Sequence, residues 1–478
     1  MFRMVYFMKR IVFFLILLLN VFWVSGKNLK YVFYFIGDGM GVNQVQTTEM
    51  YKAELEGKIG LSPLCFTQFP VSTVASTYSA TNSVTDSAAG GTALATGVKT
   101  KNGAIGVMQD LKTEVSSVAV WAKNSGKRVG IATSVSVDHA TPSAFYAHES
   151  SRNNYYEIGI DLYKAGFDFY AGSDFISPED KNGNGSNLYE MADEYGYTIV
   201  RGYDDYKMKS KKSKKMILFQ EEELSKRDRY SLPYAIDRTG SELNLENITK
   251  CAIDFLTKDC KNGFFLMVEG GKIDWACHSN DGATMINEII DFDNAIKVAY
   301  EFYLQHKDET LIVVTADHET GGISLGTGKY ELNLKILEHQ KNSESVFSTQ
   351  VKKLRNRYGN GVPWDSVKDL LMDSFGFWDE INVSEENSER LMTIYEKSIK
   401  ADDVKMEKSE YSLDEPLAGE AKRIINELAY LGWNTGGHSA GYVPVFAIGV
   451  GSNNFTRRLN NIDVPNIIAK VAGYEKSR

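Results

Sequence analysis

The chain has 478 residues, of which 43% are hydrophobic and 24% charged, and its formal net charge at pH 7 is −9. This is ordinary globular composition, with enough apolar residues for a large core. The acidic balance excludes the basic footprint of a nucleic-acid-binding surface. An anionic substrate would therefore need local cations, which bound metal ions can provide. The length permits two or three domains, but α/β enzymes of this size often have one core with insertions, and we expect that arrangement.

Residues 1–26 have the features of a secretory signal peptide. Three basic residues lie within residues 1–10, residues 11–24 form an apolar run, and small residues suited to cleavage follow. The run of about 14 residues is short for a spanning helix, which needs roughly 20, so we expect cleavage; an uncleaved anchor is the alternative. Translation from Met8 would leave a more usual start. We expect residues 27–478 to be exported to the periplasm or the extracellular space, with no stable membrane span.

Five apolar runs are predicted to be buried strands, and polar residues adjoin each of them. In chain order these runs are residues 31–36, 128–133, 264–268, 311–315 and 443–450. Because they are continuous rather than alternating, they are typical of a parallel sheet covered on both faces.

Helical patterns lie between these runs. Residues 244–256 and 283–303 carry apolar side chains at spacings of three and four. The alternation of strands and helices predicts an α/β fold, a three-layer sandwich whose largely parallel central sheet is covered by helices on both faces.

Two segments are predicted to be peripheral. Residues 207–215 contain six lysines, which is typical of a solvated loop; a specific anion-binding or surface-binding role is the alternative. Residues 325–420 are polar and mostly helical in pattern, as at 365–373 and 388–400. We expect this stretch to be a helical insertion over or beside the functional site.

The segment from Asp180 to Gly185 is similar to the start of a calcium-binding loop. The acid that would close such a loop, Glu190, comes one position early. A turn built from glycine and asparagine is therefore favoured, and calcium binding is the alternative.

The four cysteines are Cys65, Cys251, Cys260 and Cys277. An exported chain permits disulfides, but four cysteines allow three full pairings and the sequence does not choose among them. Since no two cysteines are spaced as a CxxC pair, a thiolate zinc cluster is not expected.

Ser87 stands where a helix is predicted to begin, with Asp86 directly before it and small residues after it. Backbone N–H groups at a helix start are unpaired and favour anions. A serine there can be a phosphate-site nucleophile, because the same donors can hold a phosphoryl oxygen. The alternative is a serine that only caps the helix.

A set of polar residues lies at the ends of the predicted strands, where open α/β sheets bind ligands. Asp274 and His278 place an oxygen and a nitrogen one helical turn apart. Mixed nitrogen and oxygen donors suit zinc, and an all-oxygen set suits magnesium. The whole set consists of Asp38, Thr141, Glu269, Asp274, His278, Asp317, His318 and His438.

Six motifs occur in the order seen in alkaline phosphatases, and the chain resembles that family from about residue 30 to 451, apart from the insertion. They are GDGMG at 37–41, TDSAA at 85–89, HATP at 139–142, VEGG at 268–271, TADH at 315–318 and GGH at 436–438. Any one motif alone would be weak, but six in order are highly specific.

The resemblance implies a role for each matching residue and a cofactor set of two Zn²⁺ and one Mg²⁺ per chain. Ser87 corresponds to the nucleophile that accepts the phosphoryl group, and Arg152 to the arginine that clamps it. The implied ligands are Asp274, His278 and His438 for one zinc, Asp38, Asp317, His318 and Ser87 for the other, and Asp38, Thr141 and Glu269 for magnesium.

These roles imply a phosphomonoester hydrolase that works through a phosphoserine intermediate. Zinc lowers the pKa of a bound serine hydroxyl, and two metals about 4 Å apart stabilise both apical oxygens of an in-line transfer. Broad specificity is expected because little contact with the alcohol is required. The implied partners are phosphomonoester substrates, inorganic phosphate and, since relatives are often dimers, a second copy of the chain.

Three positions depart from the family pattern or leave it open. His139 stands where the family varies between aspartate and histidine, and Trp275 stands where relatives often have lysine or histidine. Such neighbours of the ligands tune metal affinity and pH optimum rather than the reaction class. Cys277 adjoins His278, but the predicted donor set is complete without it.

Two other classes of function remain open from the sequence. A sulfatase or phosphodiesterase could use the same fold, although a sulfatase nucleophile should precede proline and arginine, and a diesterase should use threonine. An exported phosphate-binding or metal-storage protein could have the same site without turnover.

Overall fold

The computed structural model describes residues 29–181, 183, 185–240, 242–328, 330–400 and 404–476. The predicted signal peptide lies outside these residues, as do Asn182 and Asn184 of the predicted turn. Within the described ranges, every helix is too short or too polar to cross a lipid bilayer.

The centre of the molecule is a sheet of ten strands. From edge to edge it consists of β16 (Leu459–Asn460), β2 (Val71–Ser76), β15 (Val443–Gly449), β8 (Thr310–Thr315), β1 (Tyr31–Gly37), β7 (Phe264–Gly270), β3 (Arg128–Thr133), β4 (Phe169–Gly172), β6 (Lys215–Phe219) and β5 (Tyr197–Arg201). Strand β15 runs antiparallel to both of its neighbours, whereas the other pairs are parallel. The predicted α/β fold with a largely parallel sheet is confirmed, although the run at 443–450 was grouped with parallel strands and is the reversed one.

Strand β1 shows why the sheet is the middle of three layers. Its side chains alternate between faces. On one face the Tyr34 hydroxyl donates to the Leu94 carbonyl of α3 (Ser87–Thr96), 3.2 Å away. On the other face Phe35 packs edge-on against Phe292 of α12 (Gly282–Gln305), with ring centroids 5.9 Å apart. An apolar strand that is buried from Val32 to Gly37 therefore packs against two helical layers at once.

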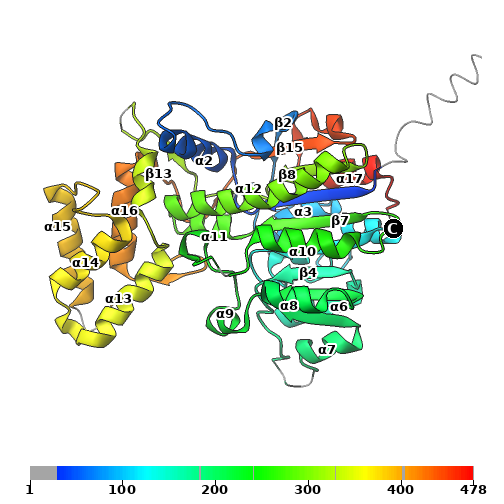
Figure 1. Cartoon of the computed structure of the whole chain (residues 1–478), viewed down its shortest axis with the longest axis horizontal. Coiled ribbons are helices and arrows are strands. Elements are labelled where there is room, and N and C mark those ends of the chain that lie inside the picture. Colours follow the sequence, from blue (N-terminus) through cyan, green and yellow to red (C-terminus); the bar gives the residue numbers. More distant parts are fainter. Residues whose placement is uncertain are drawn as a thin grey trace, which may run out of the picture.

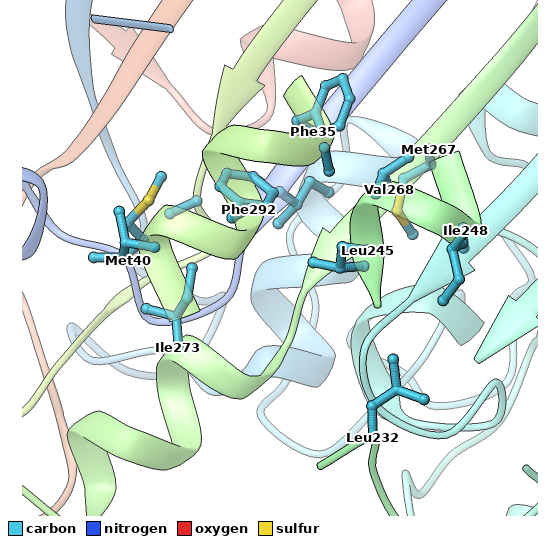
Figure 2. Close-up of a cluster of buried hydrophobic side chains, with 14 of the residues drawn as sticks. Phe35, Met40, Leu232, Leu245, Ile248, Met267, Val268, Ile273 and Phe292 are labelled. Atoms are coloured by element: carbon cyan, nitrogen blue, oxygen red, sulfur yellow. The ribbon is translucent and has the colours of Figure 1, made fainter. Parts of the chain in front are cut away.

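Figure 2 shows part of the core around the strands β1 and β7 and the helices α10 and α12. Phe35, Met267 and Val268 come from strands, Phe292 from α12, and Leu245 and Ile248 from α10 (Leu245–Thr257). All six side chains are fully buried. Burying each such side chain contributes about 1.5–3 kcal/mol to stability, which fixes the helices on the sheet.

The helices cover the sheet and lie beside the end at which its parallel strands terminate. Besides α3, α10 and α12, they are α2 (Val42–Leu55), α4 (Val118–Asn124), α5 (Ala140–Ser143), α6 (Tyr155–Ala165), α7 (Leu188–Glu194), α8 (Gly202–Lys209), α9 (Glu222–Arg227), α11 (Lys272–His278) and α17 (Asp463–Ala472). Helices predicted at 244–256 and 283–303 correspond to α10 and α12.

A helical lobe, residues 334–400 and 404–428, lies beside one end of α12 (Figure 1). Inside it the Phe347 and Phe375 rings are 5.1 Å apart and fully buried, and they belong to the same hydrophobic core as the side chains around the sheet. A short hairpin in it was not predicted from the sequence. The lobe contains α13 (Glu344–Tyr358), α14 (Trp364–Phe375), α15 (Glu385–Ile394), β11 (Glu407–Lys408), β12 (Leu413–Asp414) and α16 (Pro416–Leu428).

Two local expectations are corrected or decided by the structure. The lysine-rich segment 207–215 is not a continuous solvated loop, because Lys207 and Lys209 belong to α8 and Lys215 begins β6. The lysines are accommodated on a helix because their charged ends stay in water while the stems pack. All four cysteines are described by the structure, and none of them is paired.

Candidate active site

Ser87 is the first residue of α3, and its hydroxyl does not cap the helix. The cap is Asp86, whose Oδ1 accepts a hydrogen bond from the Ala89 N–H at 3.0 Å. The alternative that Ser87 only caps the helix is therefore wrong, because Asp86 is the cap. Ser87 is fully buried, and its Oγ lies 3.2 Å from Nε2 of His318.

Glycines after Ser87 let its helix approach the strand ends. A Cβ on Gly90 would lie 3.0 Å from the Asp317 carbonyl oxygen, and one on Gly91 would lie 3.1 Å from Cα of Thr141. Backbone atoms cannot yield at such distances, so larger residues would push α3 outward. The small-residue run therefore brings the Ser87 hydroxyl into the cluster of polar side chains.

The Nε2 atoms of two histidines, His278 and His438, point toward the same position. Nδ1 of His278 donates to the Gly436 carbonyl at 2.7 Å, and Nδ1 of His438 donates to the Thr85 carbonyl at 2.8 Å. Their Nε2 atoms, which then carry lone pairs, are only 3.1 Å apart. Asp274 adds Oδ2 at 3.3 Å from Nε2 of His278. Lone pairs directed at a common point beside a carboxylate are the donor arrangement of a metal site.

A second group adjoins the first and lies beside Ser87. Asp38, Asp274 and His318 offer ligand atoms within 4.8 Å of one another. Nε2 of His318 is 3.2 Å from Oδ1 of Asp38 and 3.4 Å from Oδ2 of Asp317. Asp317 also accepts backbone N–H bonds from Gly39 and His318, at 3.3 and 3.0 Å, so its orientation is fixed by the turn.

A third group lies on the other side of Asp38. Oγ1 of Thr141 is 3.4 Å from Oδ2 of Asp38, and Glu269 accepts a hydrogen bond from Thr133. Potential ligand atoms of His139, Asp38 and Glu269 lie within 4.8 Å of one another. A histidine nitrogen is therefore next to the oxygen ligands that the sequence predicted for magnesium. The sheet register brings these residues together, because Ile36, two residues before Asp38, pairs with Glu269.

The buried carboxylates have unused acceptor atoms. Oδ1 of Asp38, Oε1 of Glu269 and Oδ2 of Asp274 have no hydrogen-bond partner. Burial and the neighbouring Asp317 carboxylate raise the pKa of Asp38 well above its usual value, and burial raises the pKa of Glu269 to about 7. Burial also holds the pKa of His318 well below its usual value, so its ring is neutral. The neutral His318 ring and the crowded carboxylates fit divalent cations, which would let the carboxylates ionise together. The Asp274 carboxylate outweighs burial and raises the pKa of His278 to about 9, so this ring would give up a proton when it binds a cation.

Arg152 lies at the mouth of this cluster. Its Nη1 is 3.5 Å from Oδ2 of Asp86, and its Nη2 donates to Nε2 of His139 at 3.3 Å and to the Tyr411 hydroxyl at 3.2 Å. The guanidinium therefore stands next to the start of α3, where Ser87 lies. A cavity of about 1070 Å³, lined by Arg152 and by His438 among others, opens from here to solvent.

Sequence reasoning missed three residues that touch the predicted set. Thr320 donates to Oδ1 of Asp274 at 2.5 Å and lies 3.2 Å from Nδ1 of His318, so it links two of the groups. Its place two residues after His318 was a usable signal. Tyr411 and Glu410 come from the hairpin of the helical lobe, and Oε2 of Glu410 is 3.5 Å from Nε2 of His278. No pattern near residue 410 links it to residue 278.

Comparisons with known proteins agree over nearly the whole chain. The family model described as "Alkaline phosphatase" matches residues 29–166 and 168–474. Alkaline phosphatase 3 of Bacillus subtilis (strain 168) is 32% identical over 455 residues, which cover 93% of this chain and 89% of that protein. Among solved structures, a cold-active alkaline phosphatase from the psychrophile Shewanella sp. is 29% identical with a TM-score of 0.76, over 92% of this chain and 99% of that one. A variant of the TAB5 alkaline phosphatase, solved with Mg bound in a site named M3, is 26% identical with a TM-score of 0.65, over 95% of this chain and 100% of that one.

Proposed function

Since the chain belongs to the alkaline phosphatase family and is a phosphatase, we propose that it hydrolyses phosphomonoesters through a phosphorylated Ser87. The observation that carries the proposal is the pair of Nε2 atoms of His278 and His438, 3.1 Å apart and each with Nδ1 held by a carbonyl. Together with the free Ser87 hydroxyl nearby, they supply the donor set and the nucleophile that the reaction needs.

The metal assignment of the proposal follows the donor types. Asp274, His278 and His438 would hold one zinc, and Asp38, Asp317 and His318 would hold a second beside Ser87. The oxygens of Asp38, Thr141 and Glu269 would hold magnesium, in keeping with the Mg-bound TAB5 variant. When bound, these cations lower the pKa of coordinated hydroxyl groups and offset the charge of phosphoryl oxygens.

Different residues of the chain would then carry out the two steps of the reaction and bind the phosphoryl group. Oγ of Ser87 attacks phosphorus, and the new O–P bond forms as the ester O–P bond breaks. The proton of the Ser87 hydroxyl passes through solvent to the ester oxygen, which leaves as the alcohol. Water then cleaves the phosphoseryl ester, which returns the Ser87 hydroxyl and inorganic phosphate. Arg152 and the backbone N–H groups at the start of α3 hold the equatorial oxygens. Because these contacts are to the phosphoryl group, broad specificity for the alcohol follows.

The test compares two serines at helix starts. Ser87→Ala should remove turnover of an aryl phosphate and the acid-stable labelling of the protein by phosphate, while leaving the melting temperature close to that of the wild type. Ser117 is the matched control, because it caps α4 by accepting from the Val120 N–H at 3.2 Å. Ser117 also donates to the Phe145 carbonyl at 2.6 Å, so Ser117→Ala should cost about 2 kcal/mol of stability and leave turnover unchanged.

The same assay separates the other candidates. Chelation should stop hydrolysis, and zinc plus magnesium should restore it. Faster cleavage of diesters or sulfate esters than of monoesters would identify a related metallo-hydrolase. Phosphate binding without turnover would identify a binding protein, and wild-type turnover by Ser87→Ala would remove the nucleophile from the proposal.

Export and dimer formation are further parts of the proposal. The leader-like residues 1–26 and the resemblance to exported phosphatases support a periplasmic or extracellular site of action. Processing at the predicted site would be read from the N-terminal residue of the secreted protein. The family resemblance supports a homodimer, and sedimentation of the purified protein would measure it.

A further inference from the structure

The hairpin of the helical lobe places one aromatic side chain in the middle of the candidate site. Tyr411 lies between β11 and β12, in a segment that follows β8 by almost 100 residues of chain. Its ring stacks on Trp275 with centroids 4.4 Å apart and planes at 8°. It also meets the edge of His278 at 5.3 Å and that of His139 at 5.9 Å. Three ring contacts on residues of the sheet edge fix the ring from several sides.

The contacts of the ring determine where its hydroxyl points. The hydroxyl accepts a hydrogen bond from Nη2 of Arg152 at 3.2 Å. The same nitrogen is 3.3 Å from Nε2 of His139, and Nη1 is 3.5 Å from Asp86. Arg152 is therefore held by three residues, which are Asp86 at the start of α3, His139, and Tyr411 of the lobe.

Such a hold matters for a long cationic side chain. A free arginine samples many rotamers, and ordering it costs about 2 kcal/mol of rotamer entropy. A guanidinium that is already oriented binds an oxyanion with less of this cost. The hydroxyl of a neutral phenol can orient the guanidinium and leave its positive charge intact. A second carboxylate would instead neutralise that charge.

We propose that Tyr411 is a positioning residue that the helical lobe supplies to the phosphate-binding site, where its hydroxyl holds Arg152 in the orientation that binds phosphate. This inference rests on the proposed role of Arg152. It assigns the hairpin a part in binding the phosphoryl group, which is common to every substrate and to the product, rather than in recognising one alcohol.

The first test removes only the hydroxyl. Tyr411→Phe keeps the stack on Trp275, so the melting temperature should stay at that of the wild type. The KM for an aryl phosphate and the inhibition constant for inorganic phosphate should both rise about three- to tenfold, since a hydrogen bond to a charged group is lost at a partly buried site. The kcat should change by less than about twofold, because Tyr411 orients Arg152 equally in the substrate complex and in the transition state. Loss of such uniform binding raises KM and leaves kcat nearly unchanged.

Tyr442→Phe is the matched control. The Tyr442 hydroxyl also accepts from an arginine, Nη1 of Arg458 at 3.3 Å, but its side chain is 47% exposed and does not line the cavity. This variant should leave all three constants unchanged. A rise of both constants in Tyr442→Phe as large as that in Tyr411→Phe would overturn the inference.

The second test is a double-mutant cycle. If Tyr411 acts through Arg152, then Tyr411→Phe in an Arg152→Ala background should change KM and the phosphate inhibition constant by less than about 1.5-fold. Equal factors in both backgrounds would mean that Tyr411 acts independently, and no effect of Tyr411→Phe in the wild type would refute its role; either result overturns this inference alone. If Arg152→Ala itself leaves both constants unchanged, the proposed role of Arg152 fails as well.

Discussion

Two regions meet at the candidate site, and they hold their side chains in different ways. At the sheet edge, Asp38, Glu269 and Asp317 follow or end the adjacent strands β1, β7 and β8, whose register is fixed by parallel pairing. The hairpin of the lobe has only two paired positions, Glu407 with Asp414 and Lys408 with Leu413. It reaches the site through the side chains of Tyr411 and Glu410.

The difference indicates a division of labour. Groups that must converge within a few ångströms are placed on elements that many buried contacts support, because loss of one contact then moves them little. Groups that adjust the site come from an element with few supports. Large effects on activity are therefore expected from the sheet edge, and smaller effects from the lobe.

The largest effect is expected when a donor of the sheet edge is removed. His438→Ala deletes one of the two facing Nε2 atoms, so bound zinc should fall and kcat/KM should drop by about 10³-fold or more. His339→Ala, in the helical lobe, is the control and should keep activity and metal content. Metal analysis beside the kinetics measures both; full activity of His438→Ala would contradict the different roles of the two regions.

A smaller loss is expected when a residue that orients the donors is changed. Thr320 donates to Asp274, so its oxygen can accept from Nδ1–H of His318, which leaves Nε2 of His318 unprotonated. Thr320→Val keeps the shape and removes both bonds, and metal affinity should fall about 10- to 100-fold. Titration with a competing chelator would measure this.

The control for Thr320→Val is a buried threonine at the other end of β8, whose hydroxyl orients no predicted ligand. Oγ1 of Thr310 in β8 is buried without a hydrogen-bond partner. Thr310→Val should leave metal affinity unchanged and stability equal or higher. Equal losses in the two variants would show that packing, and not orientation of His318, is what Thr320 supplies.

The same contrast explains what could be predicted from the sequence. The central strands were predictable because each is an apolar run that ends in a polar motif, so Asp38 and Asp317 could be placed at one edge without knowing any contact. Strands such as β5 and β6 were missed because they are short, and lysines precede β6. Tyr411 could not be placed, since nothing local to residue 411 records that Trp275 will lie 4.4 Å away. The proposed metal and catalytic roles come from the motifs and stay predictions.

The lobe also provides a pH-dependent term in stability. Glu344 is buried and paired with Lys422 at 2.6 Å, yet burial outweighs the pair and raises its pKa to about 7 from the ordinary 4.5. Between these values the folded state binds more protons, so stability should fall by about 3 kcal/mol as pH rises from about 4.5 to 7 and should level off above pH 7. Glu344→Gln should remove this contribution and make the slope less steep, while the buried Asp138 and Glu288, whose pKa values burial also raises to about 7, keep their own share of it.

Thermal unfolding of the wild type and variant across this pH range measures the difference. Glu385→Gln, at the exposed start of α15, is the control and should keep the wild-type slope. Since Glu344 belongs to the lobe, metal-dependent activity of Glu344→Gln should match that of the wild type. An unchanged slope in Glu344→Gln would assign the titration to other groups.

The smallest effect is expected from Glu410, although its carboxylate lies near a predicted ligand. Its carboxylate is 3.5 Å from Nε2 of His278, but its side chain is 48% exposed, so water and salt screen the interaction. Glu410→Gln should therefore change KM and kcat by less than about threefold and should leave zinc content unaltered. Raising the salt concentration should narrow the difference between wild type and variant. A loss comparable to that of His438→Ala would mean that the lobe supplies a metal ligand itself, and the proposed division between the two regions would then have to be abandoned.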